Sequence, residues 1–158
     1  DVKFSQEMTQ RRRVAEQNDS FMRFIKTLKA EMDEKELIRL LKSYSSELGR
    51  DVGRRQAENS PDTKFQTFVA TFRPPKYDDV LTLEIVEDTK DAFQLRVTEC
   101  IWASTFIDAG LGGEIGHAAV CHMDYSWPRA FNASFRMERN RTLMQGHDHC
   151  NHRYLARA

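Results

Sequence analysis

Residues 81–98 read LTLEIVEDTKDAFQLRVT, and they carry the clearest structural pattern in the chain. Apolar and polar residues alternate from Leu81 to Ile85 and again from Phe93 to Thr98, which is the period of a strand with one buried face. A polar turn at residues 88–91 separates the two runs. The pattern therefore predicts an antiparallel hairpin.

The chain before this hairpin has the apolar period of helices. Residues 4–31 contain neither Pro nor Gly, and their apolar side chains recur at helical spacing. Asp33, with Glu36 three positions later, predicts a capping box that starts a second helix. Ser60-Pro61 is typical of the start of a third helix, and Pro74-Pro75 predicts its end.

The chain after the hairpin mixes both periods. Residues 101–109 and 114–124 have helical spacing, and we expect the second of these helices to be broken near Pro128. Further strands are predicted to begin at Phe135 and at Cys150. The expected fold is α+β, with a helical N-terminal half packed on a small antiparallel sheet of about four strands.

Composition restricts the class of protein. The chain has 158 residues, 40% of them hydrophobic and 30% charged, and its 24 Lys+Arg balance its 24 Asp+Glu. We predict a single domain over residues 1–158, with a helical scaffold at 1–75 and a mixed part at 76–158 that carries the site. The balanced charge argues against a nucleic-acid partner.

The same composition sets expectations for location. No apolar run approaches the roughly 20 residues of a membrane span, so we expect no membrane partner. No signal peptide is visible, and three widely spaced cysteines do not suggest a disulfide framework. A cytoplasmic location fits best. The helices over residues 4–57 are compatible either with a homo-oligomer or with a core of this chain alone.

The groups able to do chemistry gather near the C-terminus. All five histidines lie between residues 117 and 152, together with Cys121 and Cys150, whereas residues 1–99 contain no Cys or His. Strand period puts Cys150 and His152 on one face, about 7 Å apart at their backbones. Cys121 and Asp124 share a helix face. If that face meets the last strand, two thiols, a carboxylate and an imidazole come together.

Three interpretations of this cluster remain open. In the first, Cys150 is a nucleophile, His152 its base, and Asp124 an orienting or proton-donating group. In the second, zinc is bound by a subset of Cys121, His147, His149, Cys150 and His152, although their spacing matches no standard zinc finger. In the third, the cysteines are buried hydrophobes and the histidines lie on the surface.

One arginine stands out on the predicted third strand. Arg139 continues the apolar face formed by Phe135 and Met137, where a guanidinium needs a partner. That partner is either a carboxylate of the ligand, held in bidentate fashion, or an internal carboxylate. Trp102 and Trp127 could form walls of a pocket or belong to the core.

The segment from Cys100 to Tyr154 resembles the L-2-amino-thiazoline-4-carboxylic acid hydrolase family. The resemblance is carried by an ordered set of short motifs, namely Cys100, Cys121-His122-x-Asp124, Ala130-Phe131-Asn132, Arg139, Thr142-Leu143-Met144-Gln145-Gly146 and Cys150-Asn151-His152-Arg153-Tyr154. It implies a hydrolase that opens a five-membered aminothiazoline ring, or a similar cyclic amidine or amide, to give an N-carbamoyl-cysteine type of product.

The resemblance also implies roles for individual residues. Cys150, His152 and Asp124 would be catalytic, while Arg139, Asn132, Cys121 and Arg153 would contact a small-molecule substrate. No cofactor is implied, and zinc stays an alternative. A direct attack by water, with Cys150 structural, is equally consistent with the residues.

The sequence departs from the family pattern at two positions. His147 stands where an acidic residue is expected, and His149 stands where a second cysteine often precedes Cys150. The order of helices and hairpins is also similar to that of the vinyl-reductase-type domains that bind small molecules, some of them with metal. A non-catalytic module that binds a small molecule or zinc is therefore the alternative function.

Overall fold

The computed structural model describes residues 9–157, and helices dominate their first half. The two long helices are α1 (Gln10–Glu31) and α2 (Glu34–Glu58). The short ones are α3 (Phe65–Val69), α4 (Ile101–Asp108), α5 (Glu114–Gly116) and α6 (Met123–Phe131), with 3₁₀ turns at Ala70–Phe72 and Leu143–Gln145. As predicted, the Asp33 side chain caps α2 by accepting from the backbone N–H of Lys35 and Glu36, whereas the Glu36 side chain pairs with Arg39 and does not complete the predicted box.

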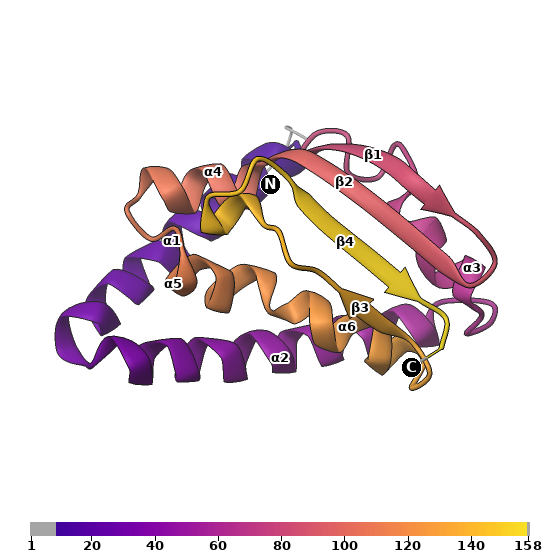
Figure 1. Ribbon diagram of the computed structural model, residues 1–158. Helices are drawn as coiled ribbons and strands as arrows, with labels where there is room; N and C mark the ends of the chain where they lie inside the picture. The colour runs from indigo at the N-terminus through magenta and orange to yellow at the C-terminus, as the bar shows by residue number, and fades with distance from the viewer. Residues whose placement is uncertain (1–8, 158) are drawn as a thin grey trace, which may run out of the picture.

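Four antiparallel strands form one sheet in the described part of the chain. They are β1 (Leu81–Asp88), β2 (Ala92–Cys100), β3 (Arg136–Glu138) and β4 (Cys150–Leu155), in the order β1-β2-β4-β3. Figure 1 shows the sheet on one side of the molecule, with the predicted hairpin β1–β2 at its far edge. The predicted α+β fold class is confirmed.

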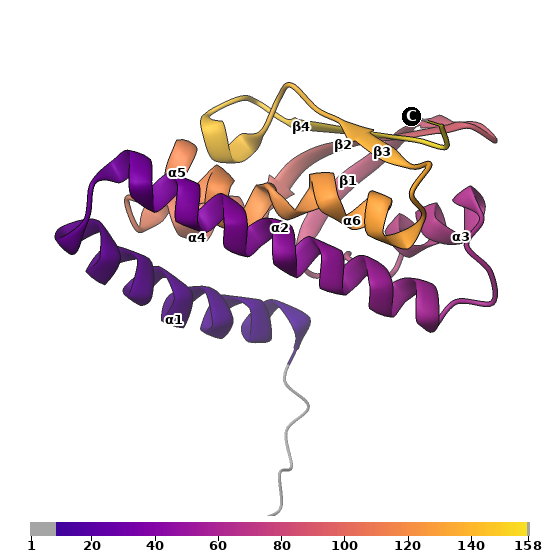
Figure 2. The same ribbon diagram turned by 90° about the horizontal axis from the view of Figure 1, so that it is seen from below.

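The helices cover one face of this sheet. Seen from below, α6 lies between α2 and the strands, and α1 lies on the far side of α2 (Figure 2). The helices α2 and α6 approach closely because Gly49 and Gly53 have no side chain, and a Cβ at Gly49 would lie 2.3 Å from the Met123 carbonyl oxygen. This close approach sets the position of α6 relative to the sheet.

Two apolar clusters hold these layers together. The larger lies between the sheet and the helices α3 and α6 and is rich in aromatic rings, with Phe68, Phe93 and Tyr154 almost inaccessible to solvent. The second joins α1, α2 and α4 around Ile25, Leu37 and Phe106. The helical scaffold and the mixed part therefore share their core. The single-domain prediction for residues 1–158 stays a prediction, because residues 1–8 and 158 lie outside the described residues.

The structure corrects two predicted helix boundaries. Ser60-Pro61 does not start a helix, because the Ser60 hydroxyl donates to the Gln56 carbonyl at the end of α2, and α3 begins only at Phe65. Pro128 does not break the last helix either. It lies inside α6, which continues to Phe131 because Trp127, Pro128 and Phe131 are buried in the packed layer.

None of the helices in residues 9–157 has the length and apolar character that crossing a membrane requires.

Candidate functional site

A cavity of about 220 Å³ lies between the sheet and the helices α4 and α6. Strands β2 and β4 supply one wall, in which Leu95 pairs with His152 and Val97 pairs with Cys150. Most of the lining is apolar, and Trp102 and Trp127 both contribute to it. The polar groups of the lining come from the C-terminal part of the chain, where the sequence concentrates its reactive residues.

Three of these polar side chains form a buried network. The Arg139 side chain is 1% exposed, and its Nη1 donates to Asp124 Oδ2 at 2.7 Å. The same Nη1 lies 2.9 Å from His152 Nε2. His152 Nε2 also lies 3.3 Å from Asp124 Oδ2. We assign the shorter contact, to Arg139, as the hydrogen bond: a guanidinium has no acceptor, so His152 Nε2 accepts and the proton of the neutral ring is placed on Nδ1. The partner of Arg139 is thus Asp124, the internal carboxylate that the sequence left as one alternative.

A distorted helical turn supplies a further contact to Arg139. Residues His117–Cys121 form a π-helical turn between α5 and α6, in which the His122 N–H bonds to the His117 carbonyl. The Tyr125 N–H bonds to His122 rather than to Cys121. The Cys121 carbonyl is therefore available to accept from Arg139 Nη2 at 2.9 Å. Such π-turns are frequent at functional sites.

Two nitrogen atoms of the network have no hydrogen-bond partner within residues 9–157. These are Arg139 Nε and His152 Nδ1, and both are buried. Each carries a proton in the assignment above, so each is an unsatisfied donor. A buried donor without a partner costs roughly 1–3 kcal/mol, and an acceptor on a bound ligand would remove this cost. The network is thus suited to a ligand with oxygen or nitrogen acceptors.

Burial controls the charge state of the network. Burial raises the pKa of Asp124, but the positive charge and the hydrogen bond of Arg139 act against burial, and that pKa lies below its ordinary value. Burial lowers the pKa of His152, so its ring is neutral. Burial likewise lowers the pKa of His117 to about 4. At neutral pH the network therefore consists of one carboxylate, one guanidinium and neutral imidazoles.

Three free thiols also line the cavity, from Cys100, Cys121 and Cys150. The Cys150 Sγ accepts the backbone N–H of Leu143 at 3.2 Å. Burial raises the pKa of the Cys150 thiol, although the Leu143 N–H and the charge of Arg139 oppose this effect. Burial raises the pKa of Cys100 to about 11 and also raises that of Cys121. All three are therefore thiols, not thiolates, at neutral pH.

The structure brings together five of the seven residues predicted for the site, since Cys121, Asp124, Arg139, Cys150 and His152 all line the cavity. The other two predicted residues, Asn132 and Arg153, do not line it. Asn132 ends α6, where its amide donates to the Thr63 carbonyl and its oxygen accepts from Ser134. Arg153 points to the other face of β4 and pairs with Glu87 at 2.7 Å.

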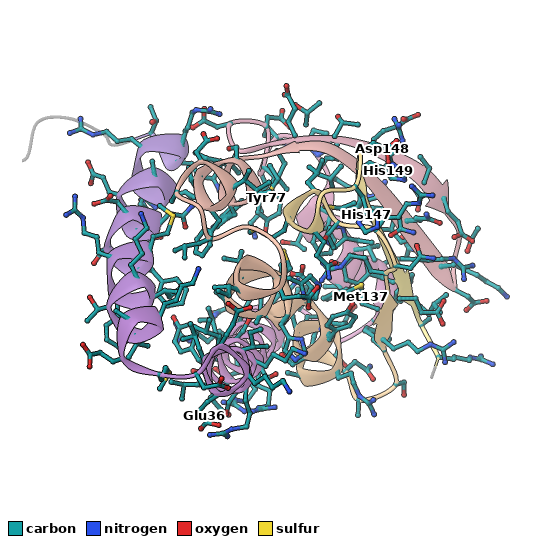
Figure 3. All side chains as sticks on the ribbon, turned by 60° about the vertical axis from the view of Figure 1, so that its left-hand side comes forward. Glu36, Tyr77, Met137, His147, Asp148 and His149 are labelled. Atoms are coloured by element: carbon teal, nitrogen blue, oxygen red, sulfur yellow. The ribbon has the colours of Figure 1, made fainter. Side chains whose placement is uncertain are left out.

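The five residues named as alternative zinc ligands do not converge. His147 and His149 lie in the turn before β4, beside Asp148 (Figure 3). His149 contacts Asp148 at 2.8 Å, and His147 Nδ1 lies near the Thr142 backbone. Among residues 9–157, no three His, Cys, Asp or Glu side chains are arranged to hold a metal ion.

Sequence reasoning missed two participants in the site. His117, to which the sequence assigned no role, lies with its Nε2 3.4 Å from Arg139 Nη2. The Tyr125 ring stacks against the Arg139 guanidinium, 5.1 Å from ring centre to carbon. Their position before and after Cys121-x-x-Asp124 on one helical segment was the available signal, but the π-turn that rotates this segment leaves no mark in the sequence.

Comparison with known proteins assigns the family. The family model of L-2-amino-thiazoline-4-carboxylic acid hydrolase matches residues 12–154, nearly the whole chain. The chain therefore belongs to this family. No curated protein matches its sequence.

A solved structure has a similar fold. It is a trafficking protein particle complex subunit 3 from Naegleria fowleri, described as covalently bound to palmitic acid. The similarity covers 90% of this chain and 92% of that chain, with a TM-score of 0.54 and 10% sequence identity. At this identity the likeness concerns the fold alone.

Proposed function

We propose that the protein is a hydrolase that opens a small ring at an amidine-like carbon, with L-2-aminothiazoline-4-carboxylate as the candidate substrate. Family membership supports this reaction class. The observation that carries the proposal is the buried Asp124–Arg139–His152 network beside the Cys150 thiol in one cavity. An apolar cavity with few, fixed polar groups is the usual form of a small-molecule site.

The reaction consumes one water molecule. Attack on the carbon between the two nitrogens and the sulfur breaks the ring C–S bond, and the departing sulfur takes a proton. Water supplies the oxygen of the resulting carbamoyl group and the added hydrogens. The unpartnered Arg139 Nε–H and His152 Nδ1–H are suited to hold acceptors of the substrate, or to stabilise negative charge that develops during attack.

This geometry changes the proposed role of Arg139. Both terminal nitrogens of its guanidinium are engaged, with Asp124 and His152 on Nη1 and with Cys121 and His117 on Nη2. Only Nε is without a partner within residues 9–157. We therefore propose that Arg139 offers the substrate one hydrogen bond and not a bidentate grip.

We propose Cys150 as the nucleophile: its sulfur bonds to the amidine-like carbon, the ring C–S bond breaks, and the ring sulfur leaves and takes a proton. Water then hydrolyses the isothiourea formed on Cys150, which supplies the carbamoyl oxygen and returns Cys150 as a thiol. Its thiol must lose a proton when substrate binds, since burial raises its pKa. The ionised Asp124 is the proposed acceptor of that proton, because the neutral His152 has its Nε2 lone pair engaged by Arg139. In the competing route water attacks directly, with Asp124 as base and no bond to Cys150.

Thiol release from L-2-aminothiazoline-4-carboxylate tests the reaction, because ring opening exposes one new thiol. We expect release by the wild type, with and without chelator, and none by Asp124→Asn. Loss of release in Cys150→Ala supports the thiol nucleophile, whereas retained release supports attack by water. Asp148→Asn, in the turn outside the cavity, is the matched control and should stay active. Absence of release from the wild type contradicts the proposed substrate.

A second candidate function is favoured by the largely apolar lining of the cavity. The protein would then hold an apolar small molecule without turnover, as the structurally similar subunit described with palmitic acid does. The two functions predict different intact masses. A binding protein isolated from cells should carry a small molecule that organic extraction, or hydroxylamine if it is a thioester, removes. A hydrolase isolated in the same way should have the intact mass calculated from its amino-acid sequence, with no added molecule.

A further inference from the structure

A second hollow lies directly beside the cavity. It is an open groove of about 670 Å³, formed where β1 begins, β2 ends and α1 and α4 pass nearby. In contrast to the cavity, its lining is rich in polar side chains, which include Thr82, Thr98, Glu99, Ser104 and His147. Many of these side chains are exposed, so the groove faces solvent.

Three residues line both hollows, namely Leu81, Cys100 and Ala103. They meet at one point in the fold, because Leu81 pairs with Cys100 across the hairpin and Ala103 follows in the first turn of α4. Two of the three have small side chains. The two hollows therefore adjoin at these three residues, where β1 begins, β2 ends and α4 follows.

We infer that this groove is the entrance to the cavity, and that Leu81, Cys100 and Ala103 form its gate. The inference rests on the proposed function only in taking the cavity as the ligand site. It implies a substrate whose reacting ring lies in the apolar cavity while a polar substituent extends past the gate into the groove. The size of the three gate residues then limits the width of compounds that reach Asp124 and Cys150.

The rest of the wall supports this choice. On the sheet side the lining side chains of Leu95, Val97 and Tyr154 are buried with at most 2% exposure. On the helix side Trp127 is held by a hydrogen bond from its indole to Gln56 at 2.7 Å. Leu81 and Cys100 are half-buried side chains at the ends of their strands, and Val120 and Met123 on the helix side are half-buried as well. Of these two parts of the wall, only the one with Leu81 and Cys100 adjoins the groove.

The rate at which a reagent alkylates Cys150 measures access to the cavity and does not depend on catalysis. In a Cys100→Ser/Cys121→Ala background, which keeps a side chain of similar size at the gate, Cys150 is the only thiol, and mass spectrometry follows its reaction with iodoacetamide. We expect Ser104→Trp, which places a large side chain in the groove, to slow this reaction several-fold. Asp108→Trp, one turn later on the same exposed side of α4, lines neither hollow and should leave the rate unchanged.

The opposite change widens the gate. Leu81→Ala should accelerate the reaction with a wide N-aryl haloacetamide more than the reaction with iodoacetamide. Leu83→Ala is its matched control, because Leu83 is also half-buried on β1 but lines neither hollow. Circular dichroism and the melting temperature verify that each variant is folded.

Two results would overturn the inference. One is a rate in Ser104→Trp equal to that in Asp108→Trp. The other is an acceleration in Leu81→Ala no larger than in Leu83→Ala, which would mean that general loosening admits the reagent. Slowing by Val120→Trp alone, on the α6 side of the cavity, would place the entrance there. Because no ring is opened in these assays, failure of the entrance is distinguishable from failure of the hydrolase.

Discussion

At the scale of the residue, the buried pair of Asp124 and Arg139 governs the site. Strand period placed Arg139 on an apolar face, and helical spacing placed Asp124 beside Cys121, so the sequence predicted that both would lie in the interior. It did not predict that they would pair with each other, because that depends on where α6 lies relative to the end of β3. The burial of an arginine at 1% exposure is possible only through this partner and the freed Cys121 carbonyl.

Removing only one member of this pair should be strongly destabilising. We expect Arg139→Met to lower the free energy of unfolding by about 3–5 kcal/mol, because Asp124 is left as an uncompensated buried charge. The double variant Arg139→Met/Asp124→Asn should regain much of that loss, since no charge remains. Urea unfolding monitored by circular dichroism gives the values for a double-mutant cycle.

A surface arginine provides the comparison for this cycle. Arg153 pairs with Glu87 outside the cavity, and its side chain is 38% exposed. Arg153→Met should cost less than about 1 kcal/mol, as is usual for exposed pairs. A cost for Arg139→Met as small as that for Arg153→Met would show that Asp124 is not confined in a buried charged state.

The positions of single residues along strands and helices explain which site residues could be predicted from the sequence. Cys150 and His152 follow from alternation on β4, and Cys121 and Asp124 from their spacing of three on a helix. Alternation also argues against Arg153, because adjacent strand residues point to opposite faces. Arg153 and Asn132 were included through the family resemblance. The positions of His117 and Tyr125 depend on the π-turn, for which residues 117–121 give no signal.

At the scale of the element, the sequence predicts the strands more accurately than the ends of the helices. The hairpin of β1 and β2 follows from alternation and a polar turn, both of which are local. The start signal at Ser60-Pro61 was misleading because Ser60 completes α2 instead, and Asp62 then holds the loop by accepting from the Lys64 N–H. The break expected at Pro128 was outweighed by burial of α6 against α2, which is a tertiary effect.

The contact of α2 with α6 depends on the absence of a side chain at Gly49. A Cβ there would lie 2.2 Å from the Ser126 hydroxyl oxygen and 2.3 Å from the Met123 carbonyl oxygen. Gly49→Ala should therefore destabilise the protein by about 1–3 kcal/mol through overpacking, although alanine favours a helix by about 1 kcal/mol. Thermal and urea unfolding give the change.

An exposed position on α2 controls for helix propensity. Ser43→Ala adds no contact and should be neutral or slightly stabilising. Because Ser126 and Met123 flank Asp124 on α6, Gly49→Ala should also reduce turnover of the proposed substrate. Stability in Gly49→Ala equal to or above that of the wild type would mean that the two helices are not in close contact.

At the scale of the whole molecule, burial of titratable groups should give a stability curve with two limbs. The pKa of His117 falls to about 4 from 6.5, chiefly through burial, and the pKa values of His122 and His152 fall for the same reason. The unfolded chain therefore binds these protons first. The stability is present above about pH 6.5 and is lost as pH falls toward 4, and Asp124 adds to the loss at lower pH.

The thiols produce the alkaline limb with the opposite sign. Burial raises the pKa of Cys100 from 9.0 to about 11, and those of Cys121 and Cys150 rise as well. Here the unfolded chain loses its protons first, so stability is present below about pH 9 and is lost as pH rises toward 11. The free energy of unfolding should thus have a plateau between about pH 6.5 and 9.

Two variants assign the limbs, and each is the control for the other. His117→Gln should flatten the loss of stability between pH 6.5 and 4 and leave the alkaline limb unchanged. Cys100→Ala should flatten the loss above pH 9 and leave the acid limb unchanged. Urea midpoints measured across pH 4–10 at constant ionic strength give both curves. An acid limb that is equally steep in His117→Gln would mean that His117 titrates normally, and hence that the π-turn does not bury it beside Arg139.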